Sequence, residues 1–456
     1  MSKSVVEGKH RVPHPNPPPH SVSKDARERA NAGEGRKGEP PWYAEGLPHI
    51  WLPYAQMATV RPPLPVVRTQ GCRIVLADGR ELIDGIASWW TACHGYNHPH
   101  ISAAVERQLA RMPHVMFGGL AHEGALTLAG RLARALPGDL ERVFFSESGS
   151  VAVEIAMKMA VQLWLNRGRR GRTRVVAFKG GYHGDTTGAM AVCDPESGMH
   201  TLFAGLLPQH FVVDLPCDAE SAHALAALLD RHADEIAGIL VEPLVQGAGG
   251  MRFHDAAVLR ALRAAADRHE MLLIFDEIFT GFGRTGSLFA CTAAGVTPDI
   301  VTLSKALTGG TLPLAATVAS RKVFEAFWSE DPAHALMHGP TYMANALACA
   351  AANASLDLFE TEPRLAQVAA IAQALEEGLA PCRGVGGVKD VRVLGAIGVV
   401  ELERIADVEA LRARFVAEGV FIRPFGSVIY LTPAFTTASD ELATLTRAVV
   451  RVVGEL

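Results

Sequence analysis

The sequence predicts an α/β protein with a large domain, in which helices flank a mainly parallel sheet, and a smaller α+β domain. After about residue 100, short apolar runs alternate with stretches of helical periodicity, which is the pattern of βαβ units. From about residue 345, helices are followed by β-branched runs and further helices. That change indicates the second, smaller domain. A chain of 456 residues has room for two to three domains.

Each element of the alternating region has its own signal. Buried parallel strands are short, continuous apolar runs, and such runs stand at 142–145, 174–178, 238–241, 272–275 and 300–303. Amphipathic helices carry apolar residues three and four apart, and such stretches stand at 123–136, 150–165, 221–231 and 256–268. Earlier in the chain, Asp78-Gly79 predicts the turn of a hairpin.

The domain boundaries follow from these changes of pattern. Residues 1–45 are rich in proline and charge and lack the apolar core of a signal peptide, so we predict a disordered extension. Residues 46–94 and 345–456 are expected to join in the smaller domain, and residues 95–344 to form the larger one.

Composition argues against several classes of protein. A hydrophobic content of 49%, a charged content of 20% and a net charge of -5 are typical of a soluble protein that binds neither nucleic acid nor a membrane surface. No apolar run is long enough to span a membrane. The seven cysteines are scattered, without a CxxC pair, so we expect neither a disulfide framework nor a metal site, but reduced thiols in a cytoplasm.

Two residues at the ends of apolar runs carry the strongest chemical signal. Lys305 follows the run 300–303, and Asp276 ends the run that begins at Leu272. The carboxyl ends of parallel strands line a ligand crevice, so these side chains are expected to meet. A desolvated lysine is nucleophilic, and a buried carboxylate can keep a pyridine nitrogen protonated. Pyridoxal phosphate requires such a pair; a solvated surface lysine is the alternative.

Two neighbouring segments are suited to the rest of such a cofactor. Gly149 and Ser150 would present backbone N–H groups to a phosphate at the start of the helix 150–165; an ordinary serine N-cap is the alternative. Tyr182 follows the run 174–178 and could stack on a flat ring, while His183 caps or fills the loop.

Two adjacent aromatic residues stand earlier, in Ser88-Trp-Trp90. Trp89 and Trp90 would point to opposite faces of a strand, or both lie in a loop. Either both belong to the core, or at least one walls a ligand pocket.

Two patterns are rejected as decoys. Gly281-Phe-Gly-Arg-Thr-Gly286 matches GxGxxG, but no acidic residue follows about twenty positions on. The apolar run 272–277, which ends in Asp276 and Glu277, resembles the acidic strand of P-loop ATPases. That interpretation also requires GxxxxGK[ST], which the chain lacks.

In combination, several motifs resemble the class III pyridoxal-phosphate aminotransferases. They are Gly180-Gly-Tyr-His-Gly-Asp185, Val241-Glu-Pro-Leu-Val-Gln-Gly-Ala-Gly-Gly250, Asp276-Glu-Ile-Phe-Thr-Gly-Phe-Gly-Arg-Thr-Gly286, Leu303-Ser-Lys-Ala-Leu-Thr-Gly-Gly310 and His338-Gly-Pro-Thr341. The resemblance covers nearly all of the chain after residue 46. It implies pyridoxal phosphate as cofactor and a fold type I homodimer with active sites at the subunit interface.

A second set of motifs resembles the members of this class that act in biotin biosynthesis. They are His49-Ile-Trp-Leu-Pro-Tyr54, Ser88-Trp-Trp90, His94-Gly-Tyr-Asn-His-Pro99, His114-Val-Met-Phe-Gly-Gly119, Met337-His-Gly-Pro-Thr-Tyr342 and Ile422-Arg-Pro-Phe-Gly426 before Tyr430. This implies S-adenosylmethionine as amino donor and 8-amino-7-oxononanoate as acceptor. The sequence departs from the pattern at Leu52, at Ala55 and in its Pro-rich tail.

Carried over position by position, the resemblance implies a role for each matching residue. Lys305 would hold the cofactor and then act as the base, and Asp276 would keep the ring nitrogen protonated. The implied phosphate ligands are Gly149, Ser150 and, from the partner subunit, Pro340 and Thr341. The implied substrate-binding residues are Tyr54, Trp89, Trp90, Tyr182, Lys305, Gly339 and Arg423. Among these, Arg423 suits a carboxylate.

Three alternatives stay open at this point. An ω-amino acid:pyruvate or ornithine-type aminotransferase would share the motifs but use small donors. A decarboxylase or aminomutase on the same scaffold would release carbon dioxide or move the amino group within one molecule. A cofactor-binding relic with a regulatory role would show no half-reaction.

Overall fold

The computed structural model describes residues 39–195 and 200–456. The chain divides into two compact units, one ending at Pro65 and one running from Val66 to Leu456. The first contains the helix α2 (Pro41–Gly46) and the 3-10 helix η1 (Leu47–His49). We predicted a disordered extension up to residue 45, but Pro41–Gly46 form the helix α2. The rest of the predicted extension, residues 1–38, lies outside the described residues.

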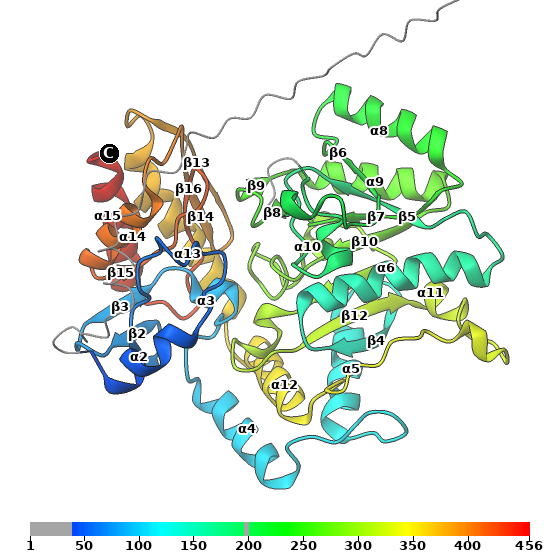
Figure 1. Cartoon of the computed structure of the whole chain (residues 1–456), viewed down its shortest axis with the longest axis horizontal. Helices are drawn as coiled ribbons and strands as arrows, with labels where there is room; N and C mark the ends of the chain where they lie inside the picture. Colours follow the sequence, from blue (N-terminus) through cyan, green and yellow to red (C-terminus); the bar gives the residue numbers. More distant parts are fainter. Residues whose placement is uncertain (1–38, 196–199) are drawn as a thin grey trace, which may run out of the picture. The chain divides into compact units, whose positions relative to one another are not determined.

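A seven-stranded sheet organises the second unit (Figure 1). In spatial order its strands are β4 (Leu140–Ser146), β12 (Ala315–Ser320), β11 (Ile300–Leu303), β10 (Leu272–Asp276), β7 (Ile236–Val241), β5 (Arg174–Phe178) and β6 (Phe211–Val213). Within this sheet β12 alone runs antiparallel to its neighbours. The predicted mainly parallel sheet is therefore confirmed.

Helices pack on both faces of this sheet. The core on one face is built by α6 (Gly149–Asn166), and the core on the other receives side chains from α5 (Glu123–Ala135), α8 (Ala219–His232) and α9 (Ala256–Arg268). Alternate residues of β10 serve the two cores, Ile274 the first and Phe275 the second. Because both faces are covered, these strands read as continuous apolar runs. The predicted strands and helices of this region lie where the sequence places them.

Two smaller sheets complete the second unit. The first has the order β1 (Val66–Gln70), β2 (Arg73–Leu76), β3 (Glu81–Asp84) and β15 (Val420–Phe421), and β15 pairs with β3 in parallel. The second is antiparallel, with the order β13 (Val388–Leu394), β14 (Ile397–Leu402) and β16 (Val428–Leu431). The predicted hairpin is β2–β3, with Gly79 donating to the Leu76 carbonyl in its turn.

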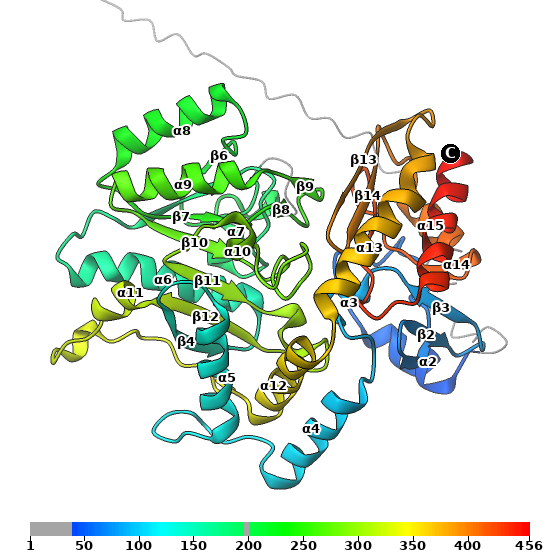
Figure 2. The ribbon, with the colours of Figure 1, turned by 180° about the vertical axis from the view of Figure 1, so that it is seen from behind.

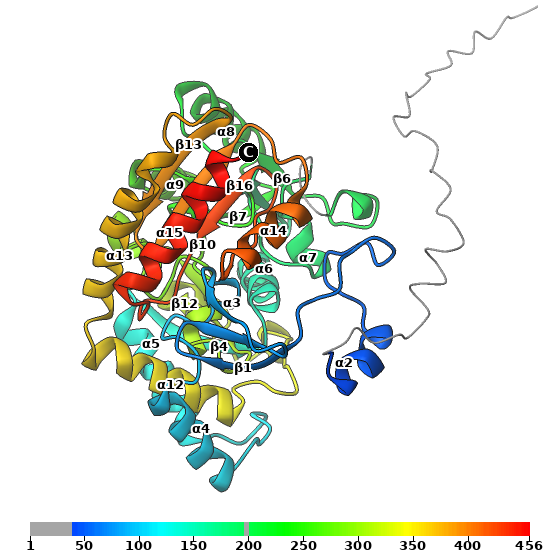
Figure 3. The same ribbon diagram turned by 90° about the vertical axis from the view of Figure 1, so that its left-hand side faces the viewer.

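Helices α13 (Arg364–Leu379) and α15 (Ser439–Gly454) run alongside the antiparallel sheet (Figures 2 and 3). The residues around β3 thus join the C-terminal part of the chain, as the sequence suggests; the proposed domain boundaries stay a prediction. The remaining elements are α3 (Ala87–Trp90), α4 (Pro99–Arg111), α7 (Thr187–Met190), η2 (Thr201–Phe203), β8 (Val245–Gln246), β9 (Arg252–Phe253), α10 (Ala290–Ala294), η3 (Lys305–Thr308), α11 (Arg321–Glu325), η4 (Pro332–His334), α12 (Ala346–Thr361), η5 (Ala380–Cys382) and α14 (Val408–Ala417).

All seven cysteines are free thiols. Within the described ranges, no helix combines the length and the apolar character needed to cross a membrane.

Candidate active site

Polar side chains gather at the carboxyl ends of four neighbouring strands. Asp276 ends β10, Lys305 follows β11, Glu242 follows β7, and His183 follows β5. In the parallel register, Asp276 lies opposite Thr302 of β11. This is the edge at which open α/β sheets bind their ligands. The predicted approach of Asp276 and Lys305 to the same edge follows from that register.

The carboxylate of Asp276 is buried and fixed from several sides. Its Oδ2 lies 2.7 Å from His183 Nδ1, while its Oδ1 accepts hydrogen bonds from the Ile278 N–H (3.1 Å) and the Thr302 hydroxyl (3.2 Å). Burial alone would lower the pKa of His183, but its hydrogen bond to Asp276 and the charges of Asp276 and Glu242 outweigh this and raise that pKa. The pair therefore holds a carboxylate at a fixed position.

His183 was expected to cap or fill its loop, so sequence analysis missed this contact. Sequence analysis gave Glu242 no role either. Burial raises the pKa of Glu242 to about 7. Its two oxygens accept the N–H groups of Tyr182 (3.1 Å) and Gly247 (2.9 Å). Glu242 directly follows the buried strand β7, and His183 comes soon after β5 of the same sheet. Their positions after these strands were the sequence signal that could have placed both residues in the site.

Lys305 opens the turn η3 with φ 46°. Burial lowers the pKa of its ammonium, although Asp276 and Glu242 act in the opposite direction. Its Nζ lies 4.8 Å from the centre of the Trp90 ring. No hydrogen bond or ion pair engages this amine in residues 39–195 and 200–456. An amine that is desolvated and unengaged is suited to act as a nucleophile and base.

The glycines after Lys305 are required by close packing. Gly309 and Gly310 have φ values of 60° and 80°. A Cβ on Gly309 would lie 2.8 Å from the Ile101 side chain, and one on Gly310 would lie 2.9 Å from the backbone of Ala92. Any larger residue would displace the turn that carries the lysine.

Helix α6 begins beside this cluster. Its N-cap is Ser148, whose hydroxyl accepts the Val151 N–H. The serine N-cap that we set against a phosphate role for Ser150 is therefore a different residue, two positions earlier. The Ser150 hydroxyl contacts that of Thr186 at 2.7 Å. In the described part of the chain no acceptor is found for the backbone N–H of Gly149 or Ser150. A Cβ on Gly149 would lie 2.9 Å from Ile278.

The side chain of Tyr182 makes polar contacts with Asp185 and, through it, His200. Its hydroxyl donates to Asp185 Oδ1 (3.0 Å), which also lies 2.9 Å from His200 Nε2. The rings of Tyr182 and His200 stack with centroids 6.1 Å apart. Arg284 is not part of this cluster: it is buried and donates to the carbonyls of Ala396 and Pro433.

The tandem tryptophans contact two different cationic side chains. Trp90 is buried against Phe279, with ring centroids 4.3 Å apart, and faces Lys305. The exposed Trp89 lies under the guanidinium of Arg423, whose carbon is 5.1 Å from the ring centre. The prediction of a strand or a loop was wrong: α3 is one helical turn with positive φ values.

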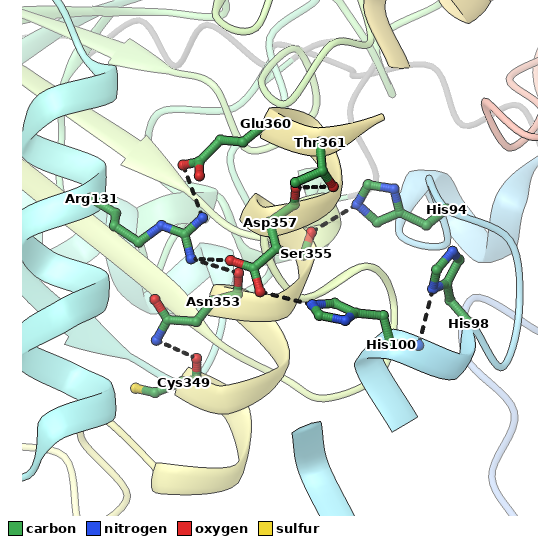
Figure 4. A network of polar contacts seen from close by, with 10 residues as sticks. All are labelled: His94, His98, His100, Arg131, Cys349, Asn353, Ser355, Asp357, Glu360 and Thr361. Atoms are coloured by element: carbon green, nitrogen blue, oxygen red, sulfur yellow. Dashed lines mark hydrogen bonds and ion pairs between the residues drawn. The ribbon is translucent and has the colours of Figure 1, made fainter. Parts of the chain in front are cut away.

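A polar network secures α12 behind this site (Figure 4). The Ser355 hydroxyl lies 3.0 Å from His94 Nε2 and 3.4 Å from the carbonyl of Ala306, the residue after the lysine. Two residues further on, Asp357 accepts a hydrogen bond from Arg131 of α5 at 2.7 Å. The Ser355 contact holds α12 against the turn η3, and the Asp357 contact holds it against α5.

Tyr54 belongs to the first unit, which ends at Pro65, whereas the cluster described above belongs to the second. Three other predicted residues of the second unit are not gathered into this cluster. Gly339, Pro340 and Thr341 lie on the segment between η4 and α12, where Gly339 and Thr341 are exposed. The Thr341 carbonyl lies 3.1 Å from His114 Nε2.

Comparison with known proteins decides the family. The family model described as aminotransferase class-III matches residues 54–453. The chain belongs to the class III aminotransferases. Pyridoxal phosphate is therefore its cofactor, and the chain is a pyridoxal-phosphate-dependent transaminase.

Relatives of this aminotransferase cover almost its whole length. An adenosylmethionine-8-amino-7-oxononanoate aminotransferase of Mycobacterium leprae is 46% identical over 415 residues, spanning 89% of this chain and 95% of that protein. The crystal structure of the Methanocaldococcus jannaschii protein of the same name has a TM-score of 0.85 and 31% identity, covering 91% of this chain and 98% of that one. An (S)-enantioselective omega-transaminase from Thermomicrobium roseum has the same TM-score and 29% identity, covering 91% and 97%.

The residues at the sheet edge fit pyridoxal phosphate. The cofactor needs an unengaged amine, a fixed carboxylate and a phosphate cradle. Lys305, Asp276 and the backbone N–H groups of Gly149 and Ser150 match these three requirements in turn.

Proposed function

We propose that this aminotransferase transfers the amino group of S-adenosylmethionine to 8-amino-7-oxononanoate, giving 7,8-diaminononanoate in biotin biosynthesis. The observation that carries the proposal is the similarity, over nearly the whole chain, to the Mycobacterium leprae protein of that name. The substrate-binding residues of the site are consistent with these two substrates.

The acceptor ends in a carboxylate, and Arg423 is suited to bind it. The guanidinium is half-buried, and no carboxylate pairs with it in the described ranges. Desolvation lowers the pKa of Arg423, and the nearby Arg412 acts in the same direction. A guanidinium in this state gains a bidentate partner when a carboxylate arrives. Tyr54 and Gly339 complete the proposed substrate-binding set.

The donor carries a sulfonium cation, which aromatic faces attract. Trp89 supplies such a face beside Arg423, and Trp90 supplies one beside Lys305. Both substrates use one site by turns, so we expect ping-pong kinetics.

When bound, pyridoxal phosphate supplies an electron-accepting ring and carries the amino group between substrates. Lys305 Nζ would take the proton from the substrate carbon and return it. Asp276, fixed by His183 and Thr302, would keep a negative charge beside the ring nitrogen. Tyr182 would stack on the ring. Gly149 and Ser150 would hold the phosphate.

We further propose a cytoplasmic homodimer. Pro340 and Thr341 would reach the phosphate site of the partner subunit; the exposure of Thr341 in the single chain is consistent with this.

The proposal is tested by incubating the holoenzyme with S-adenosylmethionine and 8-amino-7-oxononanoate and following 7,8-diaminononanoate by mass spectrometry. We expect product that depends on both substrates. A second candidate is an ω-transaminase, which the equal TM-score of the Thermomicrobium roseum enzyme favours. Product from a small amine donor, with none from S-adenosylmethionine, would support that candidate instead.

The role of Arg423 has its own prediction. Arg423→Met should raise KM for 8-amino-7-oxononanoate by roughly 10- to 100-fold, because it removes charge-assisted hydrogen bonds to the carboxylate. Arg423→Lys keeps the charge but not the bidentate geometry, so a smaller rise is expected.

Two controls sharpen the Arg423 measurement. The exposed Arg404→Met should leave KM unchanged. With the methyl ester of the acceptor, which has no carboxylate, wild type and Arg423→Met should differ little. An equal loss on acid and ester would show that Arg423 acts in another way.

A further inference from the structure

The turn α3 has an unusual backbone. Ala87, Ser88, Trp89 and Trp90 have φ values of 47°, 47°, 55° and 73°, and none of them is glycine. The turn is closed by hydrogen bonds from Trp90 N to the Ile86 carbonyl (3.0 Å) and from Thr91 N to that of Ala87 (2.9 Å). L-residues disfavour a left-handed helical turn. Such strain persists only where the surroundings impose it, and it gathers at functional sites.

One carboxylate, that of Asp84, accepts hydrogen bonds from the residues at the start of this turn. Asp84 Oδ1 accepts the N–H of Ile86 (2.9 Å), and its Oδ2 accepts the N–H of Ser88 (3.0 Å). The hydroxyl of Tyr96 donates to the same Oδ2 and lies 2.6 Å from the Ser88 hydroxyl. Asp84 therefore binds the start of the turn through both oxygens, and Tyr96 ties its second residue to the same group.

This carboxylate is not part of an ion pair. It is 2% exposed, and no lysine, arginine or histidine lies within ion-pair distance of it in the described part of the chain. A buried charge without a cation is costly. A contribution to the free energy of folding is thus a poor explanation for a carboxylate at position 84. Its hydrogen bonds to the strained turn indicate instead that Asp84 holds the conformation of that turn.

The residue that holds the turn, Asp84, lies on a paired strand. Asp84 ends β3 and pairs with Phe421 of β15. Between Asp84 and the turn, a Cβ on Gly85 would lie 2.9 Å from the Leu431 side chain. Two residues after Phe421 comes Arg423, so the same pair of strands carries both the turn and the guanidinium.

The turn places its two tryptophans beside the side chains of Lys305 and Arg423. It places the Trp90 ring 4.8 Å from Lys305 Nζ and the Trp89 ring 5.1 Å from the Arg423 guanidinium carbon. Neighbouring side chains of a strand would point to opposite faces of a sheet. The left-handed turn instead lets two consecutive tryptophans reach the cofactor end and the substrate end of one site.

We propose that Asp84, assisted by Tyr96, is a positioning residue that holds the left-handed turn Ala87–Trp90 and so aims Trp90 at Lys305 and Trp89 at Arg423. It does not touch substrate; it acts through the two rings. The inference rests on the proposed roles of Lys305 and Arg423, and it extends them to a residue outside the site.

The test uses Asp84→Asn in the holoenzyme. Its amide places an NH2 group against one of the two N–H donors, so the turn should relax. We expect kcat/KM to fall roughly 10- to 100-fold, since displacements of about 1 Å cost that much. The near-ultraviolet circular dichroism of the tryptophans should weaken as well, while the cofactor content is retained. Kinetics are measured with whichever amine donor the wild type uses, so the result does not depend on the donor assignment.

Two further variants separate positioning from folding. Asp78→Asn, an exposed turn residue of the β2–β3 hairpin, is the matched control and should behave as wild type. Adding Ser88→Gly to Asp84→Asn should recover part of the activity and of the tryptophan signal, because glycine adopts positive φ without steric cost.

The outcomes are distinct. If Asp84→Asn folds with wild-type kinetic constants and tryptophan signal, or only melts earlier, the inference is wrong. If it does not fold, Tyr96→Phe replaces it; a fall of a few fold supports the inference, and wild-type values overturn it. Full activity of Lys305→Ala would instead overturn the proposed function.

Discussion

Alanine in place of Lys305 should lower amino transfer by about 10³-fold or more, because the change removes both the nucleophile and the base. Burial lowers the pKa of this amine, and no hydrogen bond or ion pair with a described residue engages it. The variant should still fold and bind pyridoxal phosphate without a covalent link. Turnover is measured by product formation, and cofactor binding by equilibrium dialysis.

The matched control for Lys305→Ala is Lys389→Ala. Lys389 lies on β13 and pairs with Glu401 at 2.9 Å. Its replacement should leave turnover unchanged. Turnover by Lys305→Ala at the level of this control would contradict the assignment of the base.

Asparagine at position 276 should lower kcat by roughly 100- to 1000-fold, since it removes a preorganised charge from a buried site. Asparagine keeps the size of the side chain and can still accept the hydrogen bonds of Ile278 and Thr302. It carries no charge, however, to keep a pyridine nitrogen protonated. The measurement is kcat at saturating substrate, together with the cofactor's absorbance.

Glu277→Gln is the matched control for Asp276→Asn. Glu277 is equally buried, but its carboxylate accepts the N–H groups of Ala290 and Cys291 at the start of α10. Its amide should lower the melting temperature, because one N–H loses its acceptor. The kcat of the folded fraction should stay near that of wild type. If both variants lost kcat equally, burial of an acid, rather than the place of Asp276, would be the relevant property.

The sheet and its reactive edge could be predicted because the necessary information is local. Runs such as 174–178 and 300–303 are apolar without interruption, and the structure places β5 and β11 at those bounds. Neighbouring parallel strands end at one edge, so Asp276 and Lys305 were expected together. Family motifs then supplied roles that spacing alone does not.

The rest depends on contacts between residues far apart in the chain. The pairing of His183 with Asp276 joins loops after β5 and β10 and has no mark in either sequence segment. The left-handed turn contains no glycine, so nothing local indicates it; Asp84 and Tyr96 impose it from outside. Thr341 was assigned to a partner's site by resemblance, because a contact between two chains leaves no pattern in the local sequence.

The measurement that tests the central claim most directly is a half-reaction. The holoenzyme is mixed separately with S-adenosylmethionine, alanine, glutamate and 4-aminobutyrate, and the visible absorbance of the cofactor is followed as it takes up the amino group. We predict conversion by S-adenosylmethionine and none at a comparable rate by the other three amines. Conversion by a common amine, with S-adenosylmethionine inert, would contradict the proposed function and leave an aminotransferase of another specificity.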